Sequence, residues 1–211
     1  MDHAATWATG YVPDVAPLRE QTPPRGQGLL IPRFRNLTQP EPDFIRGYGL
    51  WGNIGTCAWG ATEAPMWALC AMLEVLPRES NRIELDPAVT DPWGIPTAKV
   101  HLTYSANELR MLEDAEESIR QTAATLGWPL ERRGRMVPGT FAHELGGARM
   151  GRDPATSVLS PFNQCWDVAN LFVLDGACFA TSGWQNPTLT MMALTARACG
   201  FIARERTQGN L

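Results

Sequence analysis

Apolar residues recur with helical spacing in the middle of this chain. Between Ser105 and Gly127 they follow one another at three- and four-residue steps, at Leu109, Leu112, Ala115, Ile119, Ala123 and Leu126. This spacing is typical of one face of an amphipathic helix. Ser105 with Glu108 three residues later is a capping-box sequence, and glycine commonly follows a helix end. We therefore predict a helix that begins after Ser105 and stops at Gly127.

Two shorter stretches, Arg82–Asp86 and Ala98–Leu102, alternate between apolar and polar residues. Alternation with period two predicts β-strands, and the Asp-Pro-Trp-Gly sequence at 91–94 consists of turn-forming residues. We expect a β-hairpin here. Farther on, the run Asn170–Gly176 is apolar at four successive positions and predicts a buried strand ending in a turn.

A second helix is predicted near the end of the sequence. Asn186 is a good N-cap residue, Pro187 suits the first helical position, and residues 188–204 are apolar on nearly every side. A helix that is apolar all round is normally buried. We expect this helix to need a covering surface.

The N-terminal region has a different composition. Six prolines in the first forty residues argue against a long helix or a central strand, because proline lacks a backbone donor. We expect an extended arm on the surface. Glycines between Gly47 and Gly60, among Tyr48, Trp51 and Trp59, predict tight turns packed under aromatic rings.

These elements predict an α+β fold. We expect a mostly antiparallel sheet with packed helices, followed by a C-terminal strand and helix that complete another domain. If that domain is missing, the strand and helix leave an apolar patch exposed, which predicts poor solubility for the chain alone.

Composition narrows the possible functions. The 211 residues are 44% hydrophobic with a net charge of −4, so disorder is excluded, and the lack of a basic patch argues against nucleic-acid binding. Five cysteines without metal-ligand spacing favour neither a disulfide framework nor a metal site. No signal peptide or transmembrane segment is visible, so a cytoplasmic location is expected.

The residues Gly47-Tyr48-Gly49-Leu50-Trp51-Gly52 match the GxGxxG pattern of dinucleotide-binding loops. A true fingerprint follows an apolar strand and opens a helix that holds the pyrophosphate. Here the pattern follows Pro42–Arg46 and runs into further glycines. We expect no nucleotide site at these residues.

Two residues are candidates for chemistry, each beside a structural alternative. His143 lies in a glycine-containing stretch, 139–151, and an imidazole with a pKa of about 6.5 suits a general base. Taken alone, it is more often a structural histidine. Asn186 could serve only as a cap, but the start of a helix also favours negative charge on a bound ligand.

Four blocks together resemble the C-terminal part of the glucose-methanol-choline (GMC) oxidoreductases, a family of FAD-dependent enzymes. The blocks are His143–Gly151 (HELGGARMG), Asp153–Leu159 (DPATSVL), Asn170–Ala177 (NLFVLDGA) and Asn186–Thr190 (NPTLT). The stretch Arg78–Trp93 is similar to the sugar-oxidising branch of the family, near pyranose oxidases and gluconate or fructose dehydrogenases.

The resemblance implies oxidation of a CH–OH group in a sugar, glycoside or other alcohol, with hydride transfer to the N5 atom of FAD. His143 would accept the hydroxyl proton and Asn186 would hydrogen-bond the same oxygen. Asp175, Gly176 and Ala177 would lie against the ribityl-pyrophosphate of FAD. Asn186, Pro187 and Thr188 would lie against the pyrimidine end of the flavin, where a helix N-terminus stabilises the charge of the reduced ring.

The sequence also departs from the family. Gly147 stands where many members have threonine, and no strand, GxGxxG loop and helix for the ADP half of FAD precede Asp43. We expect a substrate-domain portion at 1–135 and a C-terminal segment at 136–211 that carries the catalytic block and the returning part of the FAD domain.

Three interpretations remain open. The chain is a fragment or truncated product, one subunit of a split enzyme whose upstream polypeptide binds FAD, or a non-catalytic carbohydrate-binding remnant. The last follows from eight tryptophans, including Trp51, Trp59, Trp93 and Trp184, whose flat faces could stack on a sugar ring, although core packing explains them equally.

Overall fold

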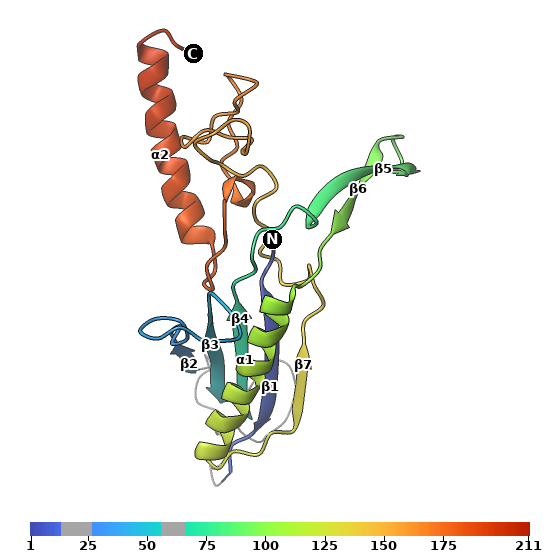
Figure 1. Cartoon of the computed structure of the whole chain (residues 1–211), viewed down its shortest axis with the longest axis vertical. Coiled ribbons are helices and arrows are strands. Elements are labelled where there is room, and N and C mark those ends of the chain that lie inside the picture. Colours follow the sequence, from blue (N-terminus) through green and yellow to red (C-terminus); the bar gives the residue numbers. More distant parts are fainter. Residues whose placement is uncertain (14–26, 56–65) are drawn as a thin grey trace, which may run out of the picture. The chain divides into compact units, whose positions relative to one another are not determined.

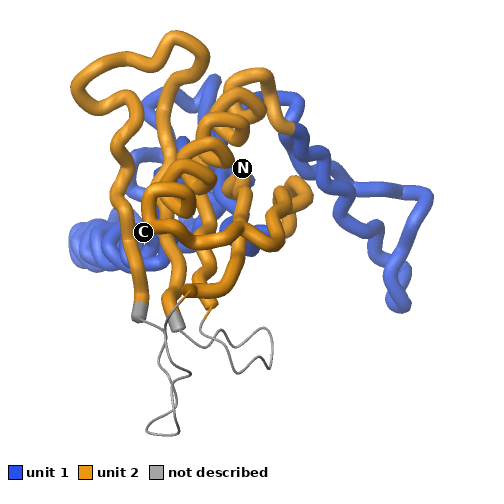
Figure 2. The backbone as a smooth tube through the Cα atoms, turned by 90° about the horizontal axis from the view of Figure 1, so that it is seen from below, with its two compact units in different colours: residues 1–2, 75–103, 141–211 blue, residues 3–74, 104–140 orange. Residues whose placement is uncertain are grey.

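A computed structural model describes residues 1–13, 27–55 and 66–211 of the chain. The chain forms two compact units, shown in different colours in Figure 2. Unit 1 contains residues 1–2, 75–103 and 141–211, and unit 2 contains residues 3–74 and 104–140. We describe each unit by itself.

Unit 2 is built on a five-stranded sheet with the order β2-β3-β4-β1-β7. All neighbouring strands are antiparallel. The strands are β1 (Ala4–Tyr11), β2 (Gln27–Ile31), β3 (Tyr48–Gly55), β4 (Met66–Leu73) and β7 (Arg132–Arg135). Helix α1 (Ala106–Thr125) lies along one face of this sheet (Figure 1). The mostly antiparallel α+β fold is confirmed.

Helix α1 forms where the apolar spacing predicted it. Ser105 is the N-cap: its side chain accepts a hydrogen bond from the Asn107 N–H, while the Glu108 carboxylate accepts the Ser105 N–H at 2.6 Å. Gly127 follows the helix end with a φ of 67°, a backbone conformation that glycine adopts without strain. The buried apolar residues are Met111, Leu112, Ala115, Ile119 and Ala123, which bury the apolar stripe against the sheet.

The prediction of an N-terminal surface arm is wrong for its first part. β1 is an interior strand that pairs with β4 and β7, and Ala4, Ala5 and Ala8 are buried. The prolines begin at Pro13, so residues 4–11 keep every backbone donor that a central strand needs. The rest of the predicted arm up to residue 26 lies outside the described residues.

The turns predicted around Gly47–Gly60 are also wrong up to residue 55, because Tyr48–Gly55 is strand β3. Glycine is required here by close approach of the backbone: a Cβ on Gly52 would lie 1.8 Å from the Ala68 carbonyl oxygen of β4. The GxGxxG residues 47–52 therefore lie at the start of an antiparallel strand and open no helix. Residues 56–65, with Trp59, lie outside the description.

The hairpin of unit 1 is confirmed. Strands β5 (Arg82–Thr90) and β6 (Pro96–His101) are antiparallel, with Ile83 opposite Val100 and Leu85 opposite Ala98. Alternation places these four residues on one face of the ribbon, and Leu85 is 71% exposed. The hairpin thus presents an uncovered apolar face.

The C-terminal segment forms fewer regular elements than predicted. Residues 170–176 are not a strand: Phe172 forms one isolated bridge with Gln164, and the 3₁₀ helix η1 (Gly176–Cys178) follows. A buried strand needs partners on both edges, whereas residues 171–173 pair along one edge with the 163–165 segment.

Helix α2 (Thr188–Thr207) is confirmed, but its N-cap and its burial differ from expectation. Pro187, with φ −82° and ψ −10°, occupies the cap position and no side chain caps the helix, so Asn186 does not act as the cap. Of the helix residues, Ala198 is the buried one, and Leu189 is 79% exposed. In this chain the apolar helix is therefore largely exposed rather than buried. In the described part of the chain, neither helix has the length and apolarity that a bilayer crossing requires.

We predict that Ser105→Ala lowers the free energy of unfolding by about 1 kcal/mol, because the Asn107 N–H loses its acceptor. Urea unfolding followed by tryptophan fluorescence measures this change, since Trp67 is buried in unit 2. Ser105→Thr keeps the hydroxyl and serves as the control. Equal midpoints for the alanine variant and the unmodified chain would show that the cap contributes nothing.

Candidate functional site

The loop that begins at His143 runs beside the 3₁₀ helix η1. Three backbone hydrogen bonds join them: Gly146 N–H to Gly176 O at 3.0 Å, Ala148 N–H to Ala177 O at 2.9 Å, and Met150 N–H to Cys178 O at 2.9 Å. The structure thus brings the predicted catalytic block into direct contact with Gly176 and Ala177 of the predicted cofactor block.

Position 176 requires glycine because the two segments approach each other closely. A Cβ there would lie 2.8 Å from the Glu144 carbonyl oxygen, from Leu145 Cδ2 and from Met191 Cε. Asp175, just before it, is exposed and accepts the Ala177 N–H at Oδ1 over 2.8 Å, so its side chain caps η1. A glycine at 176 is therefore needed for packing, independently of any contact with a cofactor.

The block Asp153–Leu159 joins the same assembly. Gly151 N–H donates to Leu159 O at 2.8 Å and Val158 N–H donates to Arg149 O at 3.1 Å. Asp153 holds the intervening turn by accepting the Ala155 N–H at 2.9 Å. This block extends the backbone contacts of the His143 loop.

Asn163 connects the next part of the chain to α2. It is fully buried with a φ of 67°, and its side-chain amide donates to Val173 O at 3.0 Å. From α2, Arg197 donates to Pro161 O at 2.5 Å and Thr195 donates to Leu174 O at 2.8 Å. The first three of the blocks that resemble the family therefore form one hydrogen-bonded structure with α2, the helix that the fourth block begins.

A small apolar core lies inside this structure. Its buried members are Leu145, Leu159, Cys178 and Phe179, and the partly buried Met191 and Leu194 of α2 pack against them. The first three blocks each contribute at least one side chain inside or next to this core, and α2 contributes Met191 and Leu194, which follow the fourth block.

His143 is half-buried at the start of the loop. Its backbone N–H donates to Asp2 Oδ1 at 3.1 Å, and its ring lies 5.1 Å from the Phe141 ring, centroid to centroid. The preceding residue, Ala142, has a φ of 63°, which is uncommon for a residue with a Cβ. Unfavourable backbone conformations of this kind concentrate at functional sites.

Asn186 and Thr188 are exposed, and Pro187 between them is buried. The Pro187 carbonyl accepts the Met191 N–H at 3.0 Å, so the first turn of α2 follows directly. The first N–H groups of any helix lack intrahelical partners and, with the helix dipole, favour a negative group. That Asn186 and His143 face one substrate stays a prediction, as do the flavin contacts of residues 175–177 and 186–188.

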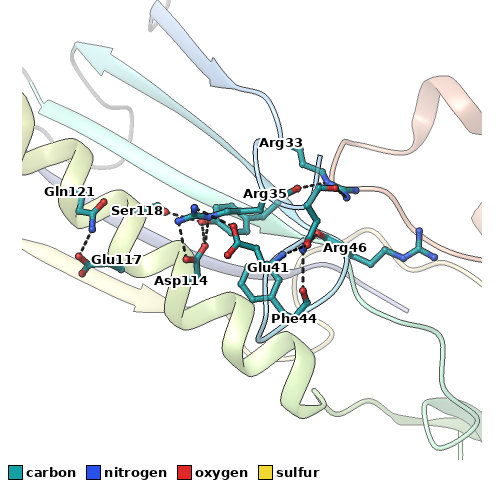
Figure 3. Close-up of polar contacts among 11 residues, drawn as sticks. Arg33, Arg35, Glu41, Phe44, Arg46, Asp114, Glu117, Ser118 and Gln121 are labelled. Atoms are coloured by element: carbon teal, nitrogen blue, oxygen red, sulfur yellow. Dashed lines mark hydrogen bonds and ion pairs between the residues drawn. The ribbon is translucent and has the colours of Figure 1, made fainter. Parts of the chain in front are cut away.

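Unit 2 holds a separate polar cluster (Figure 3). The Arg35 guanidinium donates to both Asp114 oxygens at 2.8 and 3.0 Å, and the buried Tyr48 hydroxyl donates to the same carboxylate and lies 2.8 Å from Ser118 Oγ. Burial, then the bond to Asp114, raises the pKa of Tyr48 above its ordinary value. This cluster attaches the β2–β3 connection to α1, and we assign it a structural role.

Sequence reasoning missed Asp2 and Asn163 as residues that organise the site. Both act on backbone groups of segments that the local sequence does not reveal: Asp2 contacts a residue 141 positions away. Positive φ at Asn163 is a familiar property of asparagine, but no local pattern predicts its burial.

Comparisons with known proteins agree with this assembly. The GMC oxidoreductase family model matches residues 77–195. The chain is 36% identical to C-glycoside 3-oxidase from Arthrobacter globiformis over 97% of its own length and 44% of that protein. It is 38% identical to 2-methyl-1,2-propanediol dehydrogenase from Mycolicibacterium austroafricanum over 62% of its length and 24% of that protein.

The fold is likewise similar to a solved structure. The crystal structure of pyridoxine 4-oxidase from Mesorbium loti has a TM-score of 0.53 at 16% identity, with 96% of this chain and 43% of that chain covered. The chain belongs to the GMC oxidoreductase family. The chain covers 24% of the length of the propanediol dehydrogenase and 44% of the length of the C-glycoside oxidase.

We predict that Gly176→Ala destabilises unit 1 by about 1–3 kcal/mol, because its Cβ would overlap backbone and side-chain atoms on both neighbouring segments. Thermal unfolding and limited proteolysis around residues 143–151 measure the effect. Gly147→Ala is the matched control, since its Cβ meets only Ala177 Cβ at an ordinary 3.9 Å. Equal stability of the two variants would contradict the tight approach at Gly176.

Proposed function

We propose that this chain is part of an FAD-dependent oxidoreductase that oxidises a CH–OH group of a sugar, glycoside or other alcohol. The observation that carries the proposal is the assembly of the first three blocks into one structure, with His143 at the start of its loop and α2 bonded to it through Thr195. The similarity to a C-glycoside 3-oxidase and to a 2-methyl-1,2-propanediol dehydrogenase supports this substrate class.

The described residues fit one part of an FAD site. The first turn of α2 is exposed and offers backbone N–H groups to an anionic group, and Asp175, Gly176 and Ala177 lie next to the His143 loop. The glycines at 47–52, in contrast, belong to β3 and form no dinucleotide loop. When bound, FAD supplies the hydride acceptor, and its ADP half needs residues beyond those described.

The chain's own residues supply the proton chemistry in this proposal. The His143 ring accepts the proton of the substrate hydroxyl as the carbinol carbon is oxidised. The Asn186 side chain donates a hydrogen bond to the same oxygen and fixes its position. His143 is half-buried, and its ring lies next to the Phe141 ring, which restricts its orientation.

A further polypeptide or chain segment completes the enzyme in this proposal. The exposed apolar side chains of α2, Leu189 and the 64% exposed Met192, are surfaces that a soluble monomer rarely presents together. Either a longer chain or an upstream FAD-binding subunit would cover them. The division at residues 135 and 136 and the cytoplasmic location stay predictions.

One observation favours a second candidate, a non-catalytic carbohydrate-binding module. Trp93, in the turn of the β5–β6 hairpin, is 83% exposed and presents a flat face that could stack on a sugar ring. Trp184 does not support this alternative because it is buried, and Trp51 is only partly exposed.

For the oxidoreductase, we predict that His143→Ala slows flavin reduction by substrate about 100-fold or more in the flavin-loaded complete enzyme, because the proton acceptor is removed. Stopped-flow absorbance measures the rate. His101→Ala removes an exposed histidine that is paired with Glu84 in the hairpin and serves as the control. An unchanged rate in the His143 variant would exclude this residue from the mechanism.

A second experiment tests whether the chain needs another polypeptide. We predict that protein purified after expression with the neighbouring upstream reading frame shows a visible flavin spectrum, and that the chain alone is colourless. A flavin spectrum from the chain alone would contradict the need for a separate ADP-binding part. Colourless protein in both cases, with glycan binding that Trp93→Ala abolishes, would favour the binding module.

A further inference from the structure

Asp2 is a buried carboxylate that contacts the backbone on both sides of Ala142. The residue is 1% exposed. Its Oδ2 accepts the Phe141 N–H at 2.9 Å and its Oδ1 accepts the His143 N–H at 3.1 Å. Both oxygens of the Asp2 side chain thus accept hydrogen bonds from the residues on either side of Ala142, at the start of the His143 loop.

Met1, next to Asp2, adds two hydrogen bonds to the same segment. Met1 N donates to Leu145 O at 2.6 Å, and Leu145 N–H donates back to Met1 O at 2.8 Å. Residues 1–2 therefore bind residues 141–145 through four hydrogen bonds within unit 1. Two of these four bonds involve a carboxylate, and bonds to an ionised acceptor are stronger than those between neutral groups.

The backbone that Asp2 binds is in an unfavourable conformation. Ala142 has a φ of 63°, and a residue with a Cβ adopts this region only when its surroundings impose it. A bidentate carboxylate on the flanking N–H groups is such an imposed constraint. Without it, Ala142 would relax toward an ordinary conformation and the direction of the His143 side chain would change.

We propose that Asp2 is a positioning residue for His143. It acts through the backbone N–H groups of residues 141 and 143 and fixes the angle at which the imidazole faces the substrate. The inference rests on the proposed function of His143 and adds a residue from the other end of the chain to that site. Misplacement of a reacting group by about 1 Å can cost a factor of about 100 in rate.

Hydrogen exchange of the chain tests the contact itself. We expect Asp2→Ala to speed exchange in peptides covering residues 141–145 by about tenfold or more, since two amides lose their acceptor. Asp91→Ala is the matched control, because Asp91 Oδ1 also accepts two N–H bonds, from Trp93 and Ile95 at 2.9 Å each, in the hairpin turn. Unchanged exchange at 141–145 would overturn the proposal.

The flavin-loaded complete enzyme tests the consequence for the site. Asp2→Asn keeps the size of the side chain and one acceptor oxygen, but its NH₂ group faces the second N–H. We expect the rate of flavin reduction to fall about tenfold or more while the substrate dissociation constant changes less than about twofold. A faster-exchanging loop with an unchanged reduction rate would overturn the positioning role.

Two further outcomes distinguish failure of the Asp2 proposal from failure of the proposed function of His143. Fast exchange throughout unit 1 in the Asp2→Asn variant would show that Asp2 only maintains the fold, which also overturns the proposal. If His143→Ala leaves reduction unchanged, the proposed function of His143 fails, whereas the exchange experiment still reports whether Asp2 holds the loop. The two hypotheses are therefore distinguishable.

Discussion

The candidate site depends on the backbone hydrogen bonds between the His143 loop and η1. Segments separated by some thirty residues lie side by side at 2.9–3.0 Å between Gly146, Ala148 and Met150 and the carbonyls of residues 176–178. Such an approach leaves no room for a side chain at Gly176, and the loop turns at Gly146 with a φ of 84°. Since few regular elements occur here, these bonds satisfy backbone groups that would otherwise be costly to bury. Loss of the approach would separate the predicted catalytic block from the predicted cofactor block.

How much of this structure could be predicted depends on the range of the interactions. Helix α1 and the β5–β6 hairpin were predicted because caps, turn residues and apolar periods are local signals. β1 and β3 were missed because β1 consists largely of alanine and threonine and β3 is interrupted by three glycines, so that pairing with β4 rather than intrinsic preference sets their place in the sheet. The strand predicted at residues 170–176 was wrong for the converse reason: an apolar run without paired neighbours does not form one.

In the candidate site, too, the residues marked by local signals could be predicted and their long-range contacts could not. The chemistry of His143 could be suggested from its glycine-containing context, and the resemblance to the family supplied Asn186 and residues 175–177. The support of these residues could not be predicted. Asp2 acts from the first residues of the chain, and Asn163 bonds to Val173 only after the chain has turned back on itself. Asn186 was interpreted as a cap because asparagine favours that position, but the conformation of Pro187 moves the cap one residue later.

Helix α2 is anchored at its middle, whereas its first turn is exposed. Its middle is anchored by Thr195 on Leu174 O, by Arg197 on Pro161 O, and by Phe201, whose ring stacks on Phe162 at 4.6 Å between centroids. Its first turn is exposed. Because a helix is stiff, anchoring its middle also fixes the direction of its N-terminal dipole without covering it. The same helix can therefore present an ordered N-terminus to an anionic group while apolar side chains such as Leu189 and Met192 are exposed.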